Sequence, residues 1–119
     1  MVKITVAKSS GFCFGVKRAI DLAQDIASKN KDVYTFGPLI HNPQEVSRLE
    51  KENIKVIEDY SKIDKGVLVL RTHGIPLDIY ENLSKKQNIK IVDAACPFVK
   101  KAQDIIKELS KDSEQIVIV

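Results

Sequence analysis

The sequence has no tryptophan, and aromatic residues make up only 6% of it. So few aromatic rings argue against a base-stacking platform for nucleic acid. Acidic and basic residues are interleaved around a net charge of +3, so no like-charge block marks a nucleic-acid or membrane surface. No apolar run reaches the length of a membrane span, and the first residues lack the apolar core of a signal peptide. We therefore expect a cytoplasmic protein whose cysteines stay reduced.

Cysteine and histidine are equally scarce, with two of each in 119 residues. Cys13 and Cys96 lie far apart in the sequence, which excludes a local CxxC zinc knuckle or redox motif. The GxxxxGK and GxGxxG fingerprints of nucleotide-binding loops are also absent. The length corresponds to one domain of ordinary size or to a piece of a larger protein, and the hydrophobic share of 44% is normal for a globular chain.

Apolar runs and helical patterns alternate along the chain. The runs predict strands at residues 2–7, 33–36, 54–57, 66–71, 89–92 and 116–119, and the periodicity predicts helices over 16–29 and after Pro43, Pro76 and Pro97. The helix after Pro76 is expected to turn Leu77, Tyr80 and Leu83 inward. Continuously apolar strands between helices are typical of a mostly parallel sheet with helices on both faces. We therefore predict a single α/β domain over residues 1–119.

One cysteine stands in an unusual turn. Cys13 lies between Gly11 and Gly15, where the predicted first strand gives way to the first helix. Glycines allow unusual backbone conformations and the close approach of another group. The N-terminus of the following helix favours thiolate over thiol. The turn therefore suits a metal or chemistry, although a small buried hydrophobe is the alternative, because free cysteine is often buried.

Both cysteines and both histidines share one position in the predicted topology. Each of Cys13, His41, His73 and Cys96 follows a predicted strand and precedes a helix. In parallel sheets the ligand crevice lies beyond the carboxyl ends of the strands, so we expect all four side chains at the same edge. Taken singly, each residue also has a structural interpretation, as a helix cap, a turn residue or inert packing.

Such a set of side chains suits three chemistries. Two thiolates and two imidazoles would suit zinc, whereas thiolates alone suit an iron–sulfur cluster. A cysteine nucleophile could instead work with a histidine base. Finally, histidines and helix N-termini could cradle a phosphate.

Four segments together resemble a known family. Residues 11–16, 40–42, 72–74 and 93–97 resemble, in order and spacing, the amino-terminal part of the LytB or IspH family of 4-hydroxy-3-methylbut-2-enyl diphosphate reductases, which serve the methylerythritol phosphate pathway to isoprenoids. The resemblance covers essentially the whole chain. It implies a three-lobed α/β enzyme with pseudo-threefold symmetry and a central 4Fe-4S cluster held by three cysteines.

The resemblance also implies residue roles. Cys13 and Cys96 match two of the three cluster ligands, and His41 and His73 match two histidines that bind the substrate diphosphate. The family removes an allylic hydroxyl as water with two electrons from a ferredoxin or flavodoxin, giving isopentenyl and dimethylallyl diphosphate. The third cysteine and the proton donor have no match here, so no catalytic residue is assigned.

Family members run to more than twice this length. We therefore expect residues 1–119 to be the first lobe of a longer enzyme, inactive without the remaining lobes. The alternative is a stand-alone α/β module that binds zinc or a phosphorylated ligand through the same edge. A Cys–His hydrolase is a weaker third possibility.

Overall fold

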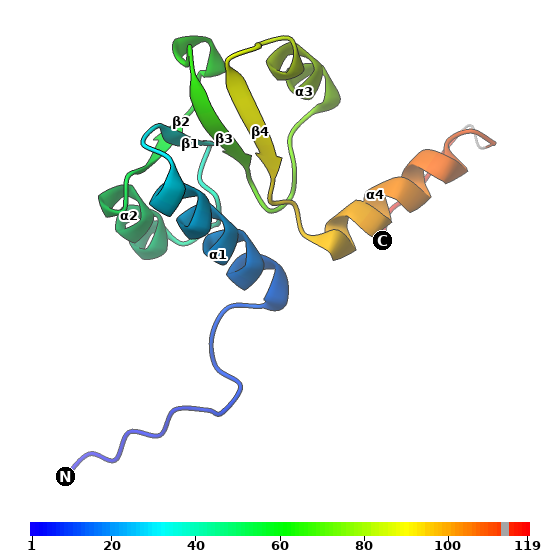
Figure 1. Ribbon diagram of the computed structural model, residues 1–119. Helices are drawn as coiled ribbons and strands as arrows, with labels where there is room; N and C mark the ends of the chain where they lie inside the picture. The colour runs from blue at the N-terminus through cyan, green and yellow to red at the C-terminus, as the bar shows by residue number, and fades with distance from the viewer. Residues whose placement is uncertain (113–114) are drawn as a thin grey trace.

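Four parallel strands form the centre of the computed structural model, which describes residues 1–112 and 115–119 (Figure 1). The strands are β1 (Val33–Phe36), β2 (Ile54–Ile57), β3 (Gly66–Leu70) and β4 (Ile89–Asp93), in the order β2-β1-β3-β4. All three pairings are parallel, which confirms the predicted parallel α/β sheet. The expected strand at 66–71 ends one residue early, and the one at 89–92 extends by one residue.

Helices cover both faces of this sheet, as predicted. Helices α1 (Phe14–Lys29) and α2 (Pro43–Lys51) lie on one face, and the 3₁₀ turn η1 (Tyr60–Lys62) and α3 (Leu77–Ser84) lie on the other. On the first face, Ala19 of α1 and Leu49 of α2 belong to one core cluster with Val69. On the second face, Leu83 of α3 is buried in a separate cluster with Leu68 and Leu70. Alternate side chains of β3 thus supply both cores.

The strand order reverses between β1 and β3. The chain passes from β1 through α2 to the edge strand β2, and then returns past β1 to β3. The loops that follow β1 and β3 therefore leave neighbouring strands toward different sides of the sheet. In α/β folds this arrangement opens a crevice for ligands at the carboxyl ends of the strands. These two loops carry His41 and His73.

Two predicted strands are wrong. Residues 2–7 and 116–119 form no strand, and their apolar side chains are exposed, Val2 at 87% and Val117 at 77%. The first segment runs away from the sheet (Figure 1). A strand needs a neighbour to satisfy its backbone groups and a core to cover its side chains. Within the described residues neither segment has such a neighbour.

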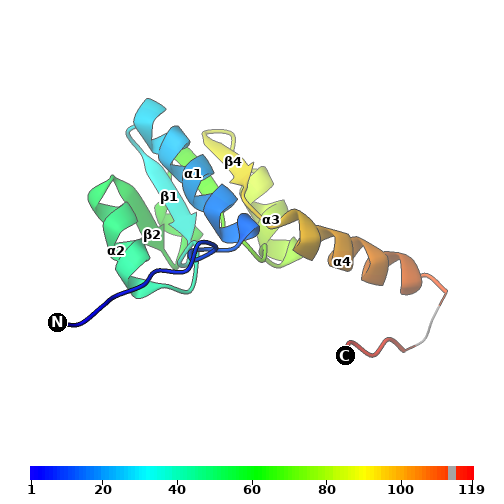
Figure 2. The same cartoon turned by 90° about the horizontal axis from the view of Figure 1, so that it is seen from below.

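The last helix, α4 (Pro97–Leu109), begins at its proline as predicted but projects from the sheet (Figure 2). It has no buried residue, so its apolar stripe, including Ile105 and Leu109, is open to solvent. Leu83 of α3 is buried as expected. Leu77 and Tyr80 are not, because they line an open cavity between α3 and α4. Among the described residues, no helix has the length and apolar character to cross a bilayer.

Candidate functional site

Cys13 is the N-cap of α1. Its carbonyl accepts a hydrogen bond from Lys17 N at 2.9 Å, while its side chain makes no capping bond and is exposed. No strand precedes it, so the predicted reason for its position was wrong. The first turn of α1, and not a strand at 2–7, carries Cys13 to the carboxyl edge of the sheet. The Cys13 thiol is therefore exposed at the N-terminus of α1.

Cys96 is the N-cap of α4 and lies against the same turn of α1. Its Sγ is 2.6 Å from the point where a Cβ on Gly15 would stand, closer than real Cβ contacts come. Gly15 therefore leaves the space that the Cys96 thiol occupies. Because Gly15 is two residues from Cys13, the two cysteines cap neighbouring helices at one place.

An aromatic pair joins the same two helix starts. Phe14 and Phe98 meet edge to face, with ring centroids 6.3 Å apart and an interplanar angle of 76°. Phe14 comes one residue after the cap Cys13, and Phe98 comes two residues after the cap Cys96. Edge-to-face pairs are weakly favourable. The contact therefore helps to hold the two cysteine-bearing turns together, although both rings remain exposed.

His41 and His73 form a stacked pair. Their rings are nearly parallel, at 6°, with centroids 4.9 Å apart and 3.2 Å between the two Nε2 atoms. At that distance one Nε2 can donate a hydrogen bond to the other, in a direction set by the ring tautomers. Burial, and then the charges of Arg71 and His41, hold the pKa of His73 below its ordinary value. An incoming anion would reverse that preference.

Local contacts fix the two histidine loops. Asn42 caps α2 as predicted, its Oδ1 accepting a bond from Glu45 N at 3.0 Å, with Pro43 in the first turn. In the other loop, Arg71 Nε donates to the Gly74 carbonyl at 3.2 Å. An Arg71 guanidinium nitrogen also lies 3.3 Å from the point where a Cβ on Gly37 would stand. Arg71 thus contacts the turns before His41 and after His73.

The cysteine pair and the histidine pair are adjacent. The Thr72 carbonyl accepts a hydrogen bond from Cys96 N at 2.7 Å, and Thr72 directly precedes His73. A cavity of about 250 Å³ lies beside the histidines, lined by Phe12, Val16, Ile40, His41, Asn42 and Thr72. It joins apolar walls with an imidazole. The four residues singled out in the sequence therefore gather at one edge.

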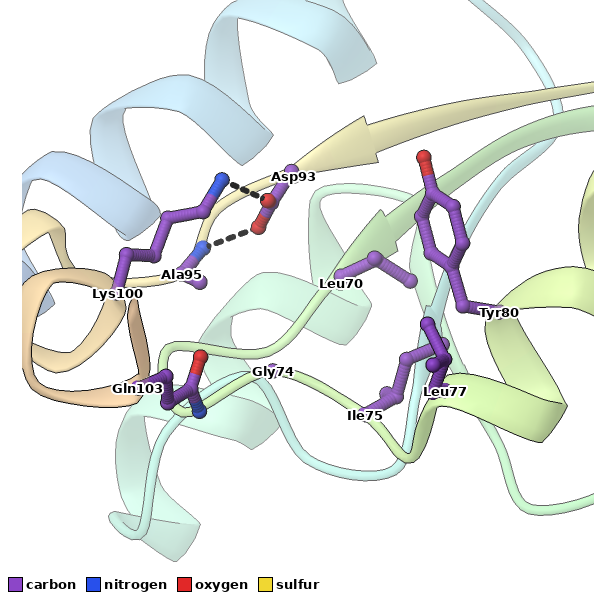
Figure 3. Close-up of a pocket in the computed structure, with 9 residues that line it drawn as sticks. All are labelled: Leu70, Gly74, Ile75, Leu77, Tyr80, Asp93, Ala95, Lys100 and Gln103. Carbon is purple, nitrogen blue, oxygen red and sulfur yellow. Dashed lines mark hydrogen bonds and ion pairs between the residues drawn. The ribbon is translucent and has the colours of Figure 1, made fainter. Parts of the chain in front are cut away.

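Two charged residues that the sequence analysis did not single out lie beside this edge. Asp93 Oδ1 accepts a hydrogen bond from Ala95 N at 2.8 Å, and its other oxygen pairs with Lys100 (Figure 3). Partial burial works against the Asp93 charge, but the bonds from Lys100 and Ala95 N outweigh it and hold its pKa below the ordinary value. The sequence held one signal for Asp93: an aspartate in a loop just before a helix commonly accepts a hydrogen bond from the backbone N–H two residues later.

The donor atoms at this edge can be compared with the needs of the cluster that the resemblance implies. Two soft thiols on adjacent helix N-termini, with space kept open by Gly15, suit iron or another thiophilic metal. Among the described residues, no three His, Cys, Asp or Glu side chains form a metal-binding group. The predicted alternatives of zinc and of an iron–sulfur cluster both remain predictions. The chemistry of Cys13 and Cys96 thus fits two ligands of such a cluster.

Known proteins resemble this chain over nearly its whole length. A 4-hydroxy-3-methylbut-2-enyl diphosphate reductase of Alkaliphilus oremlandii is 49% identical over 120 residues, covering 99% of this chain and 43% of the relative. The enzyme of the same name from Nautilia profundicola is 51% identical over 118 residues, 97% of this chain and 41% of the relative. The chain thus spans less than half the length of these relatives.

Solved structures agree. A structure of (E)-4-hydroxy-3-methyl-but-2-enyl diphosphate reductase, the terminal enzyme of the non-mevalonate pathway, superposes with a TM-score of 0.77 at 41% identity over 95% of this chain and 40% of its own. The Plasmodium falciparum reductase gives 0.81 at 33% identity over 88% of this chain and 33% of its own. The family described as "LytB protein" matches this chain over residues 4–119. This chain therefore belongs to the LytB protein family.

Proposed function

We propose that residues 1–119 act as the first lobe of a three-lobed 4-hydroxy-3-methylbut-2-enyl diphosphate reductase and carry half of its cluster and substrate site. The observation that carries the proposal is the junction at Thr72, where a cysteine pair on two helix N-termini adjoins a stacked histidine pair. The names of the relatives and of the solved structures support it.

In this proposal, Cys13 and Cys96 are thiolate ligands of a 4Fe-4S cluster. Each cysteine is the N-cap of a helix, α1 or α4, and its side chain makes no capping bond, so the sulfur is not occupied by the helix end. When bound, the cluster would supply electrons and a Lewis-acid iron for the substrate oxygen. A third cysteine would come from another lobe.

His41 and His73 bind the substrate diphosphate. Their stacked rings present Nε2 atoms at the crevice, and His41 lies one residue before the N-cap of α2. Free backbone N–H groups at a helix start favour phosphate oxygens. Burial, and then the charges of Arg71 and His41, lower the pKa of His73, and a bound anion beside the ring would favour its charged form. The adjacent cavity with Val16 and Ile40 would take the hydrocarbon chain.

The overall reaction breaks the allylic C–O bond. The hydroxyl leaves as water, and two electrons and two protons complete the exchange, giving isopentenyl or dimethylallyl diphosphate. A ferredoxin or flavodoxin supplies the electrons in the cytoplasm. This chain's own residues bind and orient, and we assign no proton donor among them. The other lobes are its obligate partners, so the chain by itself is inactive.

A chimera tests this function. Residues 1–119 replace the matching 120-residue segment of the Alkaliphilus oremlandii relative, and reductase activity is measured anaerobically with a reduced viologen dye. Cys13→Ser and Cys96→Ser should abolish activity and lower the bound iron. His41→Asn and His73→Asn should raise KM while the iron content stays unchanged. Full activity in either cysteine variant would refute the ligand assignment.

The runner-up is a stand-alone module that binds zinc or a phosphorylated ligand. The stacked histidines favour it, because they could hold a phosphate without any metal. Metal analysis after anaerobic purification and reconstitution with iron and sulfide separates the two proposals. Stoichiometric zinc with no iron in the chimera would favour the module, whereas iron and sulfide that depend on both cysteines would favour the reductase.

A further inference from the structure

The turn between β4 and α4 determines where Cys96 lies. Three hydrogen bonds hold this turn. Asp93 Oδ1 accepts from Ala95 N at 2.8 Å, the Thr72 carbonyl accepts from Cys96 N at 2.7 Å, and an Arg18 guanidinium nitrogen donates to the Ala95 carbonyl at 3.4 Å. The first has a charged acceptor and the third a charged donor, and such bonds are about twice as strong as neutral ones, but the third is the longest of the three.

Lys100 holds the same carboxylate from the other side. It pairs with Asp93 Oδ2, so one oxygen faces the turn and the other faces α4 (Figure 3). Helix α4 has no buried residue, and Phe98 links it to α1 through the exposed edge-to-face pair with Phe14. Among the described residues, the side-chain hydrogen bonds from α4 to the sheet and its loops are Lys100 to Asp93 and a longer one, at 3.4 Å, from Gln103 to the His73 carbonyl. Asp93 thus joins the strand end, the turn and the helix.

The thiol at the end of this turn has little freedom. Cys96 Sγ occupies the space left by the missing side chain of Gly15, and a small rotation of the turn would drive it into α1 or away from it. We propose that Asp93 is a positioning residue that sets the place of Cys96 Sγ, through Ala95 N and with Lys100 as its support. That Cys96 then serves as a cluster ligand rests on the proposed function.

Outer-sphere groups of this kind matter to metal sites. Residues that orient a ligand without touching the metal commonly change metal affinity or activity by about ten- to a hundredfold when they are replaced. Asp93 meets the geometric condition for such a role, since its carboxylate bonds the residue directly before the ligand. Its loss should therefore weaken the site without removing any ligand.

The first experiment needs no cluster. The alkylation rate of Cys96 in the 119-residue chain is measured by mass spectrometry, with exposed Cys13 as the internal reference. Asp93→Ala should speed Cys96 alkylation roughly tenfold by freeing the turn. Asp93→Asn, which keeps an acceptor for Ala95 N, should stay within about twofold of the wild-type rate. Lys100→Gln, which keeps Asp93 but removes the charge of its partner, should fall between them.

Asp59 offers a matched control. Its Oδ1 accepts a bond from Ser61 N at 2.9 Å, the same i to i+2 contact, but it follows the other edge strand, β2. Asp59→Ala should leave the Cys96 rate unchanged. Equal rates in Asp93→Ala and wild type would overturn the proposal. An Asp93→Asn rate as high as that of Asp93→Ala would also overturn it, because an acceptor for Ala95 N would then not hold Cys96 in place.

Bound iron provides the second measurement. After reconstitution of the chimera, Asp93→Ala should hold less iron or lose it roughly tenfold faster to a chelator, and Asp93→Asn should restore retention. Unchanged iron retention in Asp93→Ala would contradict the role toward the cluster. If Cys96→Ser also kept its iron, the ligand assignment itself would fail, while the alkylation rates would still decide the positioning role.

Discussion

At the scale of single residues, the site depends on what is missing as much as on what is present. The absent side chain of Gly15 makes room for a thiol, and the absent capping bonds of both cysteines leave their sulfurs free. The sequence indicated the importance of Gly15, because a cysteine between glycines suggests close approach. It could not indicate that the approaching group is Cys96, since that contact joins distant parts of the chain.

Gly15→Ala should destabilise the chain. Its new Cβ would stand 2.6 Å from Cys96 Sγ and 3.0 Å from Cys96 Cβ, so the free energy of unfolding should fall by about 1–3 kcal/mol. Urea unfolding measures the change. In a Cys96→Ala background the closer contact is gone, so the same substitution should cost less. An equal cost in both backgrounds would show that the two residues do not meet.

His73 should make stability depend on pH. Its pKa is lowered in the fold, first by burial and then by Arg71 and His41, so the unfolded chain takes up a proton more readily. The contribution of His73 is therefore present above the unfolded value of about 6.5 and is lost as the pH falls below it. His73→Gln should flatten the pH dependence of urea unfolding between about pH 7 and 5. A profile identical to wild type would contradict the shift.

At the scale of elements, sequence patterns located every strand of the sheet. The runs at 33–36, 54–57, 66–71 and 89–92 were predicted because fully buried parallel strands are continuously apolar. The equally apolar runs at 2–7 and 116–119 failed, because apolar character shows that a segment needs covering and not what covers it. The same reason explains α4, which the periodicity predicted but which has no buried residue.

Asn42 should contribute measurably through its helix cap. Asn42→Ala removes the acceptor for Glu45 N at the start of α2, and should lower the free energy of unfolding by about 1 kcal/mol. Asn42→Asp keeps an acceptor oxygen and serves as the control, with stability close to wild type. If both variants were equally destabilised in urea, the cap would not be the cause.

Thr35 should tolerate loss of its hydroxyl. It is fully buried in β1, and its Oγ1 has no hydrogen-bond partner among the described residues. Thr35→Val replaces the unpaired hydroxyl with a methyl group of similar size, and should raise the free energy of unfolding by about 1 kcal/mol. Thr35→Ala should lower it, because it leaves a cavity. A loss of stability in Thr35→Val would indicate a partner for the hydroxyl.

At the scale of the whole molecule, the fold brings four scarce residues to one edge. Parallel strands end at a common edge, and the change of direction between β1 and β3 opens the crevice where the histidines meet. The sequence predicted this convergence from topology, correctly for the loops of His41, His73 and Cys96, whereas the strand expected before Cys13 is not formed. The sequence could not predict the stacking of the histidines or the bonds of Asp93 to Ala95 N and Lys100, because both depend on side-chain geometry at loop ends.

The central claim is that Cys13 and Cys96 lie together in the folded chain. The most direct measurement treats the 119-residue chain with a short bifunctional thiol reagent, with and without urea, and identifies the products by mass spectrometry. We predict an intramolecular bridge between Cys13 and Cys96 in the folded chain and little bridging in urea. Independent modification of the two thiols in the folded chain, with no more bridge than in urea, would contradict the account.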